Sequence, residues 1–248
     1  MGTHILARIS ESRFCPNKIF YYHTILGLEF RSLNEKCLLR KPMDIIFEKV
    51  DQRSLSQKQL DFVLDELLAV SGSDSVPAQR EIFDAFFKLG DTCFLARKND
   101  VLIGYYWAFR THHIITYDDY KSKNLEIELA SNMIFFGNGF IHPSFRLKGV
   151  FPHFAKYCIQ QFSCDSRFIT ATDIENNLSL NSHNRLGYLQ QFQLTCISLW
   201  RLHLHFIKAK QHRPVIRFHF HRARKSMPKI NASMLVSDQA SLAELSHA

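Results

Sequence analysis

The chain has 248 residues, of which 46% are hydrophobic and 22% are charged. This composition is typical of a globular protein and excludes a disordered chain, a collagen-like repeat and a coiled coil. The length allows one large domain or two small ones, each with a buried core. The formal net charge of +8 indicates by itself an anionic partner.

The positive charge is concentrated near the C-terminus. Residues 176–237 contain no Asp or Glu, and residues 201–229 carry nine Lys and Arg, so the rest of the chain is close to neutral. We expect a leader at 1–41 that packs on a body at 42–204, followed by a basic C-terminal strand and tail at 205–248. A strand with a solvated tail is favoured over nucleic-acid binding, while peripheral contact with an anionic membrane surface stays open.

The cysteines and the N-terminus indicate the compartment. The six cysteines show no C-x-x-C pattern and no regular spacing, which argues against a zinc ribbon or a disulfide framework and favours a reducing compartment. The longest apolar run near the start, residues 19–30, is interrupted by His23 and Glu29 and is shorter than the ~20 residues that span a bilayer. We therefore expect a soluble cytoplasmic protein without a transmembrane segment or signal peptide.

The first half of the chain predicts a strand, two helices and a hairpin. Residues 43–50 are rich in β-branched side chains and predict the strand. Ser56 and Gln59 form a capping-box pattern ahead of a helix with one apolar face. The next helix starts near Pro77 and ends at Gly90. Two extended runs on either side of a short polar turn then predict a β-hairpin, at residues 92–97 and 101–110.

The second half alternates strands and helices. The expected elements are, in order, strands at 125–130 and 133–141, a helix at 149–162, a strand at 168–172, a helix at 176–186 and a strand at 188–200. Helices that follow strands suit crossover connections between parallel strands. The pattern therefore predicts an α/β fold, with a mixed, partly parallel central sheet flanked by helices on both faces.

The most informative segment, residues 141–151, leaves a strand, turns through a basic loop that contains Gly149 and enters a helix. Such a loop directs backbone N–H groups at one point, and the helix dipole adds partial positive charge, so the segment suits a phosphate or pyrophosphate. Arg146 and Lys148 add full charges beside it. A plain strand-to-helix turn with two solvated basic residues fits the loop equally well.

Two motifs carry a resemblance to a known family. Arg146, Gly149 and the preceding Ile141-x-Pro143 match an Arg/Gln-x-x-Gly-x-Gly/Ala pattern that follows a strand, with Phe151 in the last position. This segment resembles the acetyl-CoA-binding motif of the GNAT superfamily of N-acyltransferases.

A downstream segment resembles a second motif of that family, Asn-x-x-Ala/Ser-x-x-x-Tyr-x-x-x-Gly-Phe. Asn176, Ser179 and Gly187 match, Tyr188 is a near match, and His183 stands in place of the usual Tyr. The resemblance covers residues 43–200.

The resemblance implies transfer of an acyl group, usually acetyl, from acetyl-CoA or another acyl-CoA to the amine of a small molecule, without a metal. It implies that backbone amides of the loop hold the pyrophosphate, that the preceding strand polarises the thioester carbonyl and that Asn176 holds the pantetheine arm. The cofactor-binding residues implied are Phe140, Ile141, Arg146, Leu147, Lys148, Gly149, Val150, Phe151 and Asn176.

The proton-transfer groups are expected near the same site. His183 stands where the family's Tyr acts as general acid, and an imidazolium can donate a proton near neutral pH; a histidine satisfied within an amphipathic helix fits equally. Glu126 and Glu128 share one face of a strand and are candidate bases, together with Asp118 and Asp119 in the loop before them. A solvated carboxylate pair and a base that acts through water remain alternatives.

Several other side chains suggest chemistry that we consider less favoured. Three histidine pairs invite a zinc site, namely His112-His113, His203-x-His205 and His219-x-His221. No Cys or carboxylate completes a set of ligands at the required spacing, so we expect polar strand faces and no metal. Cys164 beside Asp165 invites a nucleophile, but nothing in the sequence orients the pair.

The leading hypothesis is a GNAT-like N-acyltransferase acting on a small amine. An amino sugar or sugar nucleotide is suggested as acceptor by a loose likeness of residues 14–33 to the leaders of such enzymes. One alternative uses a longer-chain acyl-CoA or an acyl carrier protein as donor and an amino acid as acceptor. The other is a degenerate GNAT-like binding module that uses the basic tail.

Overall fold

The computed structural model describes residues 20–39, 42, 44–51, 55–72, 76–116, 124–199, 202–210, 212–220 and 228–236. The strands are β1 (Phe20–Phe30), β2 (Ile45–Val50), β3 (Thr92–Lys98), β4 (Val101–Phe109), β5 (His112–Thr116), β6 (Asn124–Glu128), β7 (Met133–Ile141), β8 (Arg167–Asp173), β9 (Tyr188–Leu199), β10 (Leu202–Ala209), β11 (Val215–Phe220) and β12 (Lys229–Asn231). The helices are α2 (Gln57–Ser71), α3 (Val76–Lys88), α4 (Val150–Gln160) and α5 (Asn177–Leu186), with short 3₁₀ turns η1 (Glu35–Leu38), η3 (Pro143–Phe145) and η4 (Ala232–Met234).

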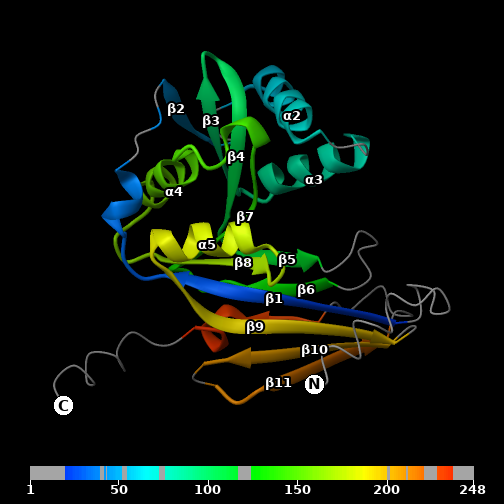
Figure 1. The fold of residues 1–248 in the computed structure, drawn as a ribbon. Helices are drawn as coiled ribbons and strands as arrows, with labels where there is room; N and C mark the ends of the chain where they lie inside the picture. The colour runs from blue at the N-terminus through cyan, green and yellow to red at the C-terminus, as the bar shows by residue number, and fades with distance from the viewer. Residues whose placement is uncertain are drawn as a thin grey trace.

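The strands form a nine-stranded sheet and a small second sheet. The large sheet has the order β11-β10-β9-β1-β8-β7-β4-β3-β2, and the small one has the order β12-β6-β5. In the large sheet β7 and β8 run parallel, whereas the other neighbouring strands are antiparallel. Helices α2 and α3 lie on one side of β3 and β4, and α4 lies on the other (Figure 1). The predicted mixed α/β fold is confirmed.

Alternation along the hairpin β3–β4 builds a core on each face of the sheet, because successive strand residues point to opposite faces. Leu95 and Trp107 pack with α2 and α3, while Phe94 and Tyr106 pack with α4. Helix α2 begins as predicted with a complete capping box from Ser56. The Asn99-Asp100 turn between the strands places both residues at positive φ, as a tight right-twisted hairpin requires.

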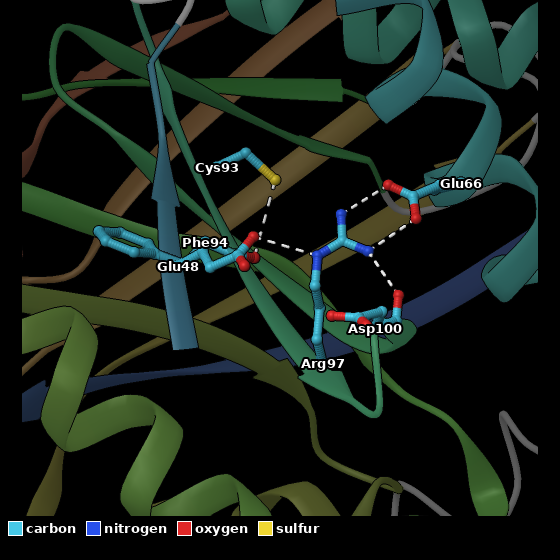
Figure 2. Close-up of polar contacts among 6 residues, drawn as sticks. All are labelled: Glu48, Glu66, Cys93, Phe94, Arg97 and Asp100. Atoms are coloured by element: carbon cyan, nitrogen blue, oxygen red, sulfur yellow. Dashed lines mark hydrogen bonds and ion pairs between the residues drawn. The ribbon is translucent and has the colours of Figure 1, made fainter. Parts of the chain in front are cut away.

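An arginine on β3 ties the hairpin to α2. Arg97 donates to both carboxylate oxygens of Glu66 on α2, at 2.6 and 2.7 Å, and to Glu48 on β2 at 3.1 Å (Figure 2). The same guanidinium donates to the carbonyl of Asp100 at 3.1 Å. These hydrogen bonds raise the pKa of Arg97. A bidentate, half-buried pair of this kind holds its partners more firmly than an exposed ion pair does.

The structure differs from the sequence analysis at residues 20–30, which it places in the middle of the large sheet. Strand β1 pairs with β8 on one side and with β9 on the other, as the blue strand in Figure 1 shows. Its polar residues interrupt the apolar pattern, and they can be buried because they have hydrogen-bond partners far along the chain. Glu29 is buried and pairs with Arg31 and Arg167.

The C-terminal segment also differs from a strand with a loose polar end. Strands β10 and β11 continue the large sheet at its edge, and β12 pairs in parallel with β6. Ile230, Leu235 and Val236 are buried in the core that also holds α2 and α3. Of the pair His219-x-His221, His221 lies outside the described residues, as do residues 222–227 and 237–248.

Two features of the described part of the chain concern membranes and metals. None of its helices combines the length and the apolar character needed to cross a bilayer. Within the same residues, no group of three or more His, Cys, Asp or Glu side chains is arranged to hold a metal ion. His203 and His205 are buried on β10 rather than presented on a solvated strand face.

Candidate active site

The parallel strands β7 and β8 part halfway along their length. They pair only over Met133–Phe136 and Arg167–Thr170, after which β7 bends away. The bend follows from a bulge in β7: Tyr105 lies opposite Phe140 and Trp107 opposite Gly137, so two residues of β7 face one residue of β4. Asn138, inside the bulge, has a φ of 48°. A bulge of this kind bends a strand and ends its pairing, and here it opens a gap in the sheet.

A cavity of about 450 Å³ fills this gap. Its walls are residues 137–141 of β7, residues 170–173 of β8, Tyr105 and Tyr106 of β4, and side chains of α4 and α5. A second cavity of about 450 Å³ shares Ile141, Arg146 and Phe151 with the first and reaches Asn34 and Lys36 near η1. The two cavities therefore form one groove that runs from the gap to the surface between η1, the loop 145–149 and α5.

The outer end of the groove is basic. Its described lining includes Lys36, Arg146 and Arg185, all exposed, and none of the described lining residues is Asp or Glu. The helix α4 begins beside these cations, and its first residue is preceded by Gly149 at a φ of 79°, with no side chain capping its amides. Uncapped N–H groups and the helix dipole add to the positive potential, so this end of the groove suits an anion such as a phosphate.

The basic loop is held in place by its own contacts. Arg146 donates from Nε to the carbonyl of Ile141 at 2.8 Å, and its guanidinium lies 5.6 Å from the ring centre of Phe140. Lys148 lies 5.8 Å from the ring centre of Phe145. Leu147, at a φ of 60°, turns the backbone between them. The charges of Arg146 and Lys148 are therefore positioned by cation–π contacts with aromatic rings. Arg146 also lines the groove.

Phe151, which stands where the resembled motif has a small residue, turns its side chain into the protein. Its ring meets that of Tyr106 edge-on at 6.1 Å and that of His183 at 4.9 Å. The large side chain thus forms the floor shared by both cavities, and the amide end of α4 stays uncovered. A phenylalanine at position 151 therefore does not block the basic end of the groove.

His183 lies in the first cavity, but burial changes its chemistry. Its Nδ1 is 2.8 Å from the carbonyl of Ser179, which can only accept, so Nδ1 carries the proton and donates. Its Nε2 then accepts from the Tyr106 hydroxyl at 3.3 Å. Burial lowers the pKa of His183 to about 4. The imidazole is therefore neutral at neutral pH, and the imidazolium acid expected from the sequence is not the form present.

Tyr106 is a polar group at this site that the sequence analysis does not single out. It lies on β4, lines the first cavity and is buried. Burial raises the pKa of its hydroxyl, so the group keeps its proton at neutral pH, and this one proton is donated to Nε2 of His183. The only signal in the sequence is the position of Tyr106 in a buried strand, which by itself indicates core packing.

Asn176 caps α5 at the edge of the first cavity. Its side-chain oxygen accepts from the amide of Ser179 at 3.0 Å, as helix N-caps usually do. All the cofactor-binding residues expected from the resemblance line one or both parts of the groove except Lys148, whose ammonium lies above Phe145. Lys36 and Arg185, which the sequence analysis does not select, join them because η1 and α5 fold beside the loop.

Glu126 and Glu128 are not brought to the groove. Both accept from Lys229 of β12, at 3.1 and 3.3 Å, on the small second sheet. Neither lines the two cavities of the groove or the cavity on the other side of the gap. Their expected role as bases is therefore replaced by a structural ion pair between β6 and β12. Asp118 and Asp119 lie outside the described residues.

Comparisons with known proteins give likeness of fold only. No protein-family model matches the sequence, and no curated protein matches it. A conserved protein of unknown function from Staphylococcus epidermidis is 15% identical with a TM-score of 0.50, over 72% of this chain and 62% of that one. A GNAT-family acetyltransferase from Colwellia psychrerythraea is 11% identical with a TM-score of 0.46, over 73% and 57%.

An aminoglycoside N-acetyltransferase solved in complex with CoA is 18% identical with a TM-score of 0.39, over 58% of this chain and 91% of that one. This chain therefore spans less than two thirds of the first two structures and most of the third. The fold itself is a mixed sheet whose parallel strands β7 and β8 separate beside α4. The resemblance of the two motifs to the GNAT superfamily remains a prediction from the sequence.

Proposed function

We propose that this protein is an N-acyltransferase that moves an acetyl or other acyl group from acyl-CoA to the amine of a small molecule. The observation that carries the proposal is the groove made of the two adjoining cavities, which is basic at the α4 end and enters the gap between β7 and β8. CoA has the same polarity, with phosphates at one end and a thiol at the other. When bound, acyl-CoA supplies an activated acyl group as a thioester.

The residues of the groove fit such a donor. Lys36, Arg146 and Arg185 provide cations for the phosphates beside the uncapped amides of α4. The backbone of residues 137–141 no longer pairs with β8, so its polar groups border the gap and are available to a pantetheine arm and a thioester carbonyl. The Tyr106 hydroxyl has one proton, so it can donate to the leaving sulfur when it turns away from Nε2 of His183.

His183 acts through Tyr106 in this proposal. The neutral imidazole accepts from the Tyr106 hydroxyl, which orients that hydroxyl at the wall of the cavity. His183 is therefore a positioning residue, and Tyr106 is the group that contacts the substrate. A thiolate is a weak base with a pKa near 8.5, so a hydrogen bond from Tyr106 is sufficient to stabilise it as it leaves.

Acyl-CoA fits the groove better than an acyl carrier protein. Among the described cations of the basic segment, Lys208, Lys210, Arg213 and Arg217 lie on or beside β10 and β11, and Lys229 lies on β12. In the large sheet, β9 and β1 separate β10 and β11 from β8 and the gap. The described cations of β10 and β11 are therefore not placed to receive an acidic carrier whose prosthetic group enters the groove beside α4.

The test is a calorimetric titration of the full chain with acetyl-CoA, CoA and longer acyl-CoAs. We expect binding by the wild type and a loss of at least about tenfold in affinity for Arg146→Ala, because one charge-assisted contact to phosphate is removed. Lys49→Ala, which removes an exposed lysine of β2 outside the groove, is the matched control. If no CoA thioester binds, the acyltransferase proposal is wrong.

A further inference from the structure

A third cavity adjoins the gap from the other face of the sheet. It has a volume of about 250 Å³ and shares Gly137, Asn138, Ala171, Thr172 and Asp173 with the first cavity. Its remaining lining residues come from β1, β5 and β7, namely His23, Ile25, His113, Ile115 and Phe135. The gap between β7 and β8 therefore connects the groove on the α4 side with a separate chamber on the opposite side.

The two chambers are lined in part by different cores, although Tyr105 and Phe140 of the first cavity pack in the same core as the small chamber. Ile25, Ile115 and Phe135 pack with the core that contains α2, α3 and the small sheet. Tyr106 and Phe154, which line the first cavity, pack with α4. A donor in the groove and a second ligand in the small chamber would therefore approach the gap from opposite faces and meet there.

Asp173 stands where the chambers join. It is the last residue of β8 and lines both cavities. Its Oδ2 lies 3.0 Å from Nε2 of His23 on β1, and its Oδ1 accepts from the amide of Glu175 at 2.8 Å. The side chain of Asp173 is 35% exposed. The carboxylate is thus held in one orientation while remaining open to a ligand.

Part of the wall of the small chamber is apolar, and Asn138 and Thr172 add neutral polar side chains. His113 stacks on Phe135 with ring centres 4.2 Å apart, and burial lowers the pKa of His113 to about 3. Ile25 and Ile115 are buried aliphatic side chains. Among the described lining residues, Asp173 is the one carboxylate. The chamber therefore complements a ligand with one cationic group attached to an apolar or aromatic body.

We propose that the small chamber binds the acceptor, that the acceptor is a primary monoamine carrying an apolar or aromatic group, and that Asp173 receives its ammonium group. The inference rests on the proposed acyltransferase function and names the acceptor class for the same site. His23 is a positioning residue that acts on the acceptor through Asp173.

The transfer step balances with these groups. The bound ammonium first gives one proton to the Asp173 carboxylate, directly or through one water, and so gains a free electron pair. The nitrogen then forms a bond to the thioester carbon while the C–S bond breaks. The nitrogen loses a second proton as the amide forms. Of the two protons, one ends on the leaving sulfur and the other is released to solvent when Asp173 is deprotonated again.

Other amines fit the chamber less well. An amino sugar would place several hydroxyl groups against Ile25, Ile115 and Phe135, where a buried polar group without a partner is unfavourable. A polyamine or an aminoglycoside carries several ammonium groups, and the described lining offers a single carboxylate. The chamber thus favours one charge and a compact apolar group.

The experiment compares acceptors in the full chain with acetyl-CoA as donor. Acetyl-CoA binding is measured first by calorimetry, and the release of CoA is then followed with 2-phenylethylamine, glucosamine, spermidine and kanamycin. We expect kcat/KM for 2-phenylethylamine to exceed that for each of the others at least about tenfold, as loss of a matched apolar contact implies. A preference for glucosamine or for a polycation would overturn the acceptor class.

Variants test the role of the carboxylate. In Asp173→Asn, kcat/KM for the amine should fall at least about 100-fold, in the range for loss of a proton acceptor, while the affinity for acetyl-CoA stays within about twofold. The matched control is Asp165→Asn, an exposed aspartate that lines none of the cavities. If Asp173→Asn keeps kcat/KM within about threefold of the wild type, Asp173 is not the acceptor group.

Variants of His23 test whether this residue orients Asp173 or only fills space beside it. His23→Ala removes the donor to Asp173 and should raise KM for the amine with a smaller change in kcat, whereas His23→Gln keeps an N–H group and should restore much of the loss. Equal loss in both variants would contradict a positioning role. If acetyl-CoA binds and the amine preference is absent, this inference alone fails; if acetyl-CoA does not bind, the proposed function fails with it.

Discussion

At His183 one imidazole is enclosed by the Ser179 carbonyl, the Tyr106 hydroxyl and the rings of Phe151 and Tyr188. Its position in a motif predicts this residue at the site, and the structure places it in the lining of the first cavity. Its protonation state depends on burial by residues from β4, α4 and β9, and no local pattern contains that information. The location of His183 could therefore be predicted from the sequence, whereas its protonation state could not.

The depressed pKa of His183 makes stability depend on pH. The folded protein protonates this group near pH 4 and the unfolded chain near pH 6.5. As pH falls between these values the unfolded state binds more protons, so stability is present above pH 6.5 and is lost toward pH 4. From pH 7 to 4.5, we expect the wild type to lose about 2 kcal/mol more than His183→Phe does.

Urea unfolding at pH 7, 6, 5 and 4.5 measures this difference. The exposed His212→Phe variant serves as the control for exchanging a histidine for phenylalanine outside the site. Parallel curves for the wild type and His183→Phe would contradict the buried, neutral imidazole.

At the scale of elements, the sequence predicts the helices and strands whose stabilising contacts lie within a few residues. The capping box of α2, the hairpin β3–β4 and the helices α4 and α5 follow from apolar periodicity, caps and turns that lie within a few residues. Strand β1 does not, because Thr24 and Glu29 break its apolar pattern. Those polar groups are satisfied by Thr195 and Arg167, more than 130 residues away.

The same distinction applies to the site. The loop 146–149 could be predicted because its residues are contiguous. The chamber around Asp173 could not, because His23, His113 and Phe135 reach it from three strands. The bulge that opens the gap depends on the register between β4 and β7, which one strand read alone does not define.

The turn between α5 and β9 offers a test at this scale. Gly187 has a φ of 111°, and a Cβ there would lie 1.7 Å from the carbonyl oxygen of Ser32, which follows β1. Gly187→Ala should therefore lower the unfolding free energy by more than the ~1–3 kcal/mol of backbone strain alone. Gly72→Ala is the matched control, since Gly72 ends α2 at a φ of 61° with nothing within 4 Å of the added carbon.

Urea unfolding of both variants separates strain from collision. Both substitutions place alanine in the left-handed region, so the difference between them reports the close approach of the turn to the chain after β1. Equal losses for the two variants would show that the backbone at Ser32 moves away without cost.

Across the whole molecule, the C-terminal segment completes the side of the protein that carries the small chamber. Strand β12 pairs with β6, which pairs with β5, and β5 supplies His113 and Ile115 to the chamber. The positive charge of the chain is divided accordingly. Lys36, Arg146 and Arg185 serve the groove, Lys229 joins β12 to β6, and the cations of β10 and β11 lie at the far edge of the sheet.

This arrangement predicts that the last described residues contribute to global stability. Ile230 is 2% exposed and packs in the core shared with α2 and α3, so Ile230→Ala should lower the unfolding free energy by about 2–5 kcal/mol. Met234→Ala is the control, because this side chain is 39% exposed and its loss should cost within about 0.5 kcal/mol. Acetyl-CoA affinity should change in neither variant, since the groove lies on the opposite face. A loss for Ile230→Ala no larger than that for Met234→Ala in urea unfolding would mean that β12 does not belong to the cooperative fold.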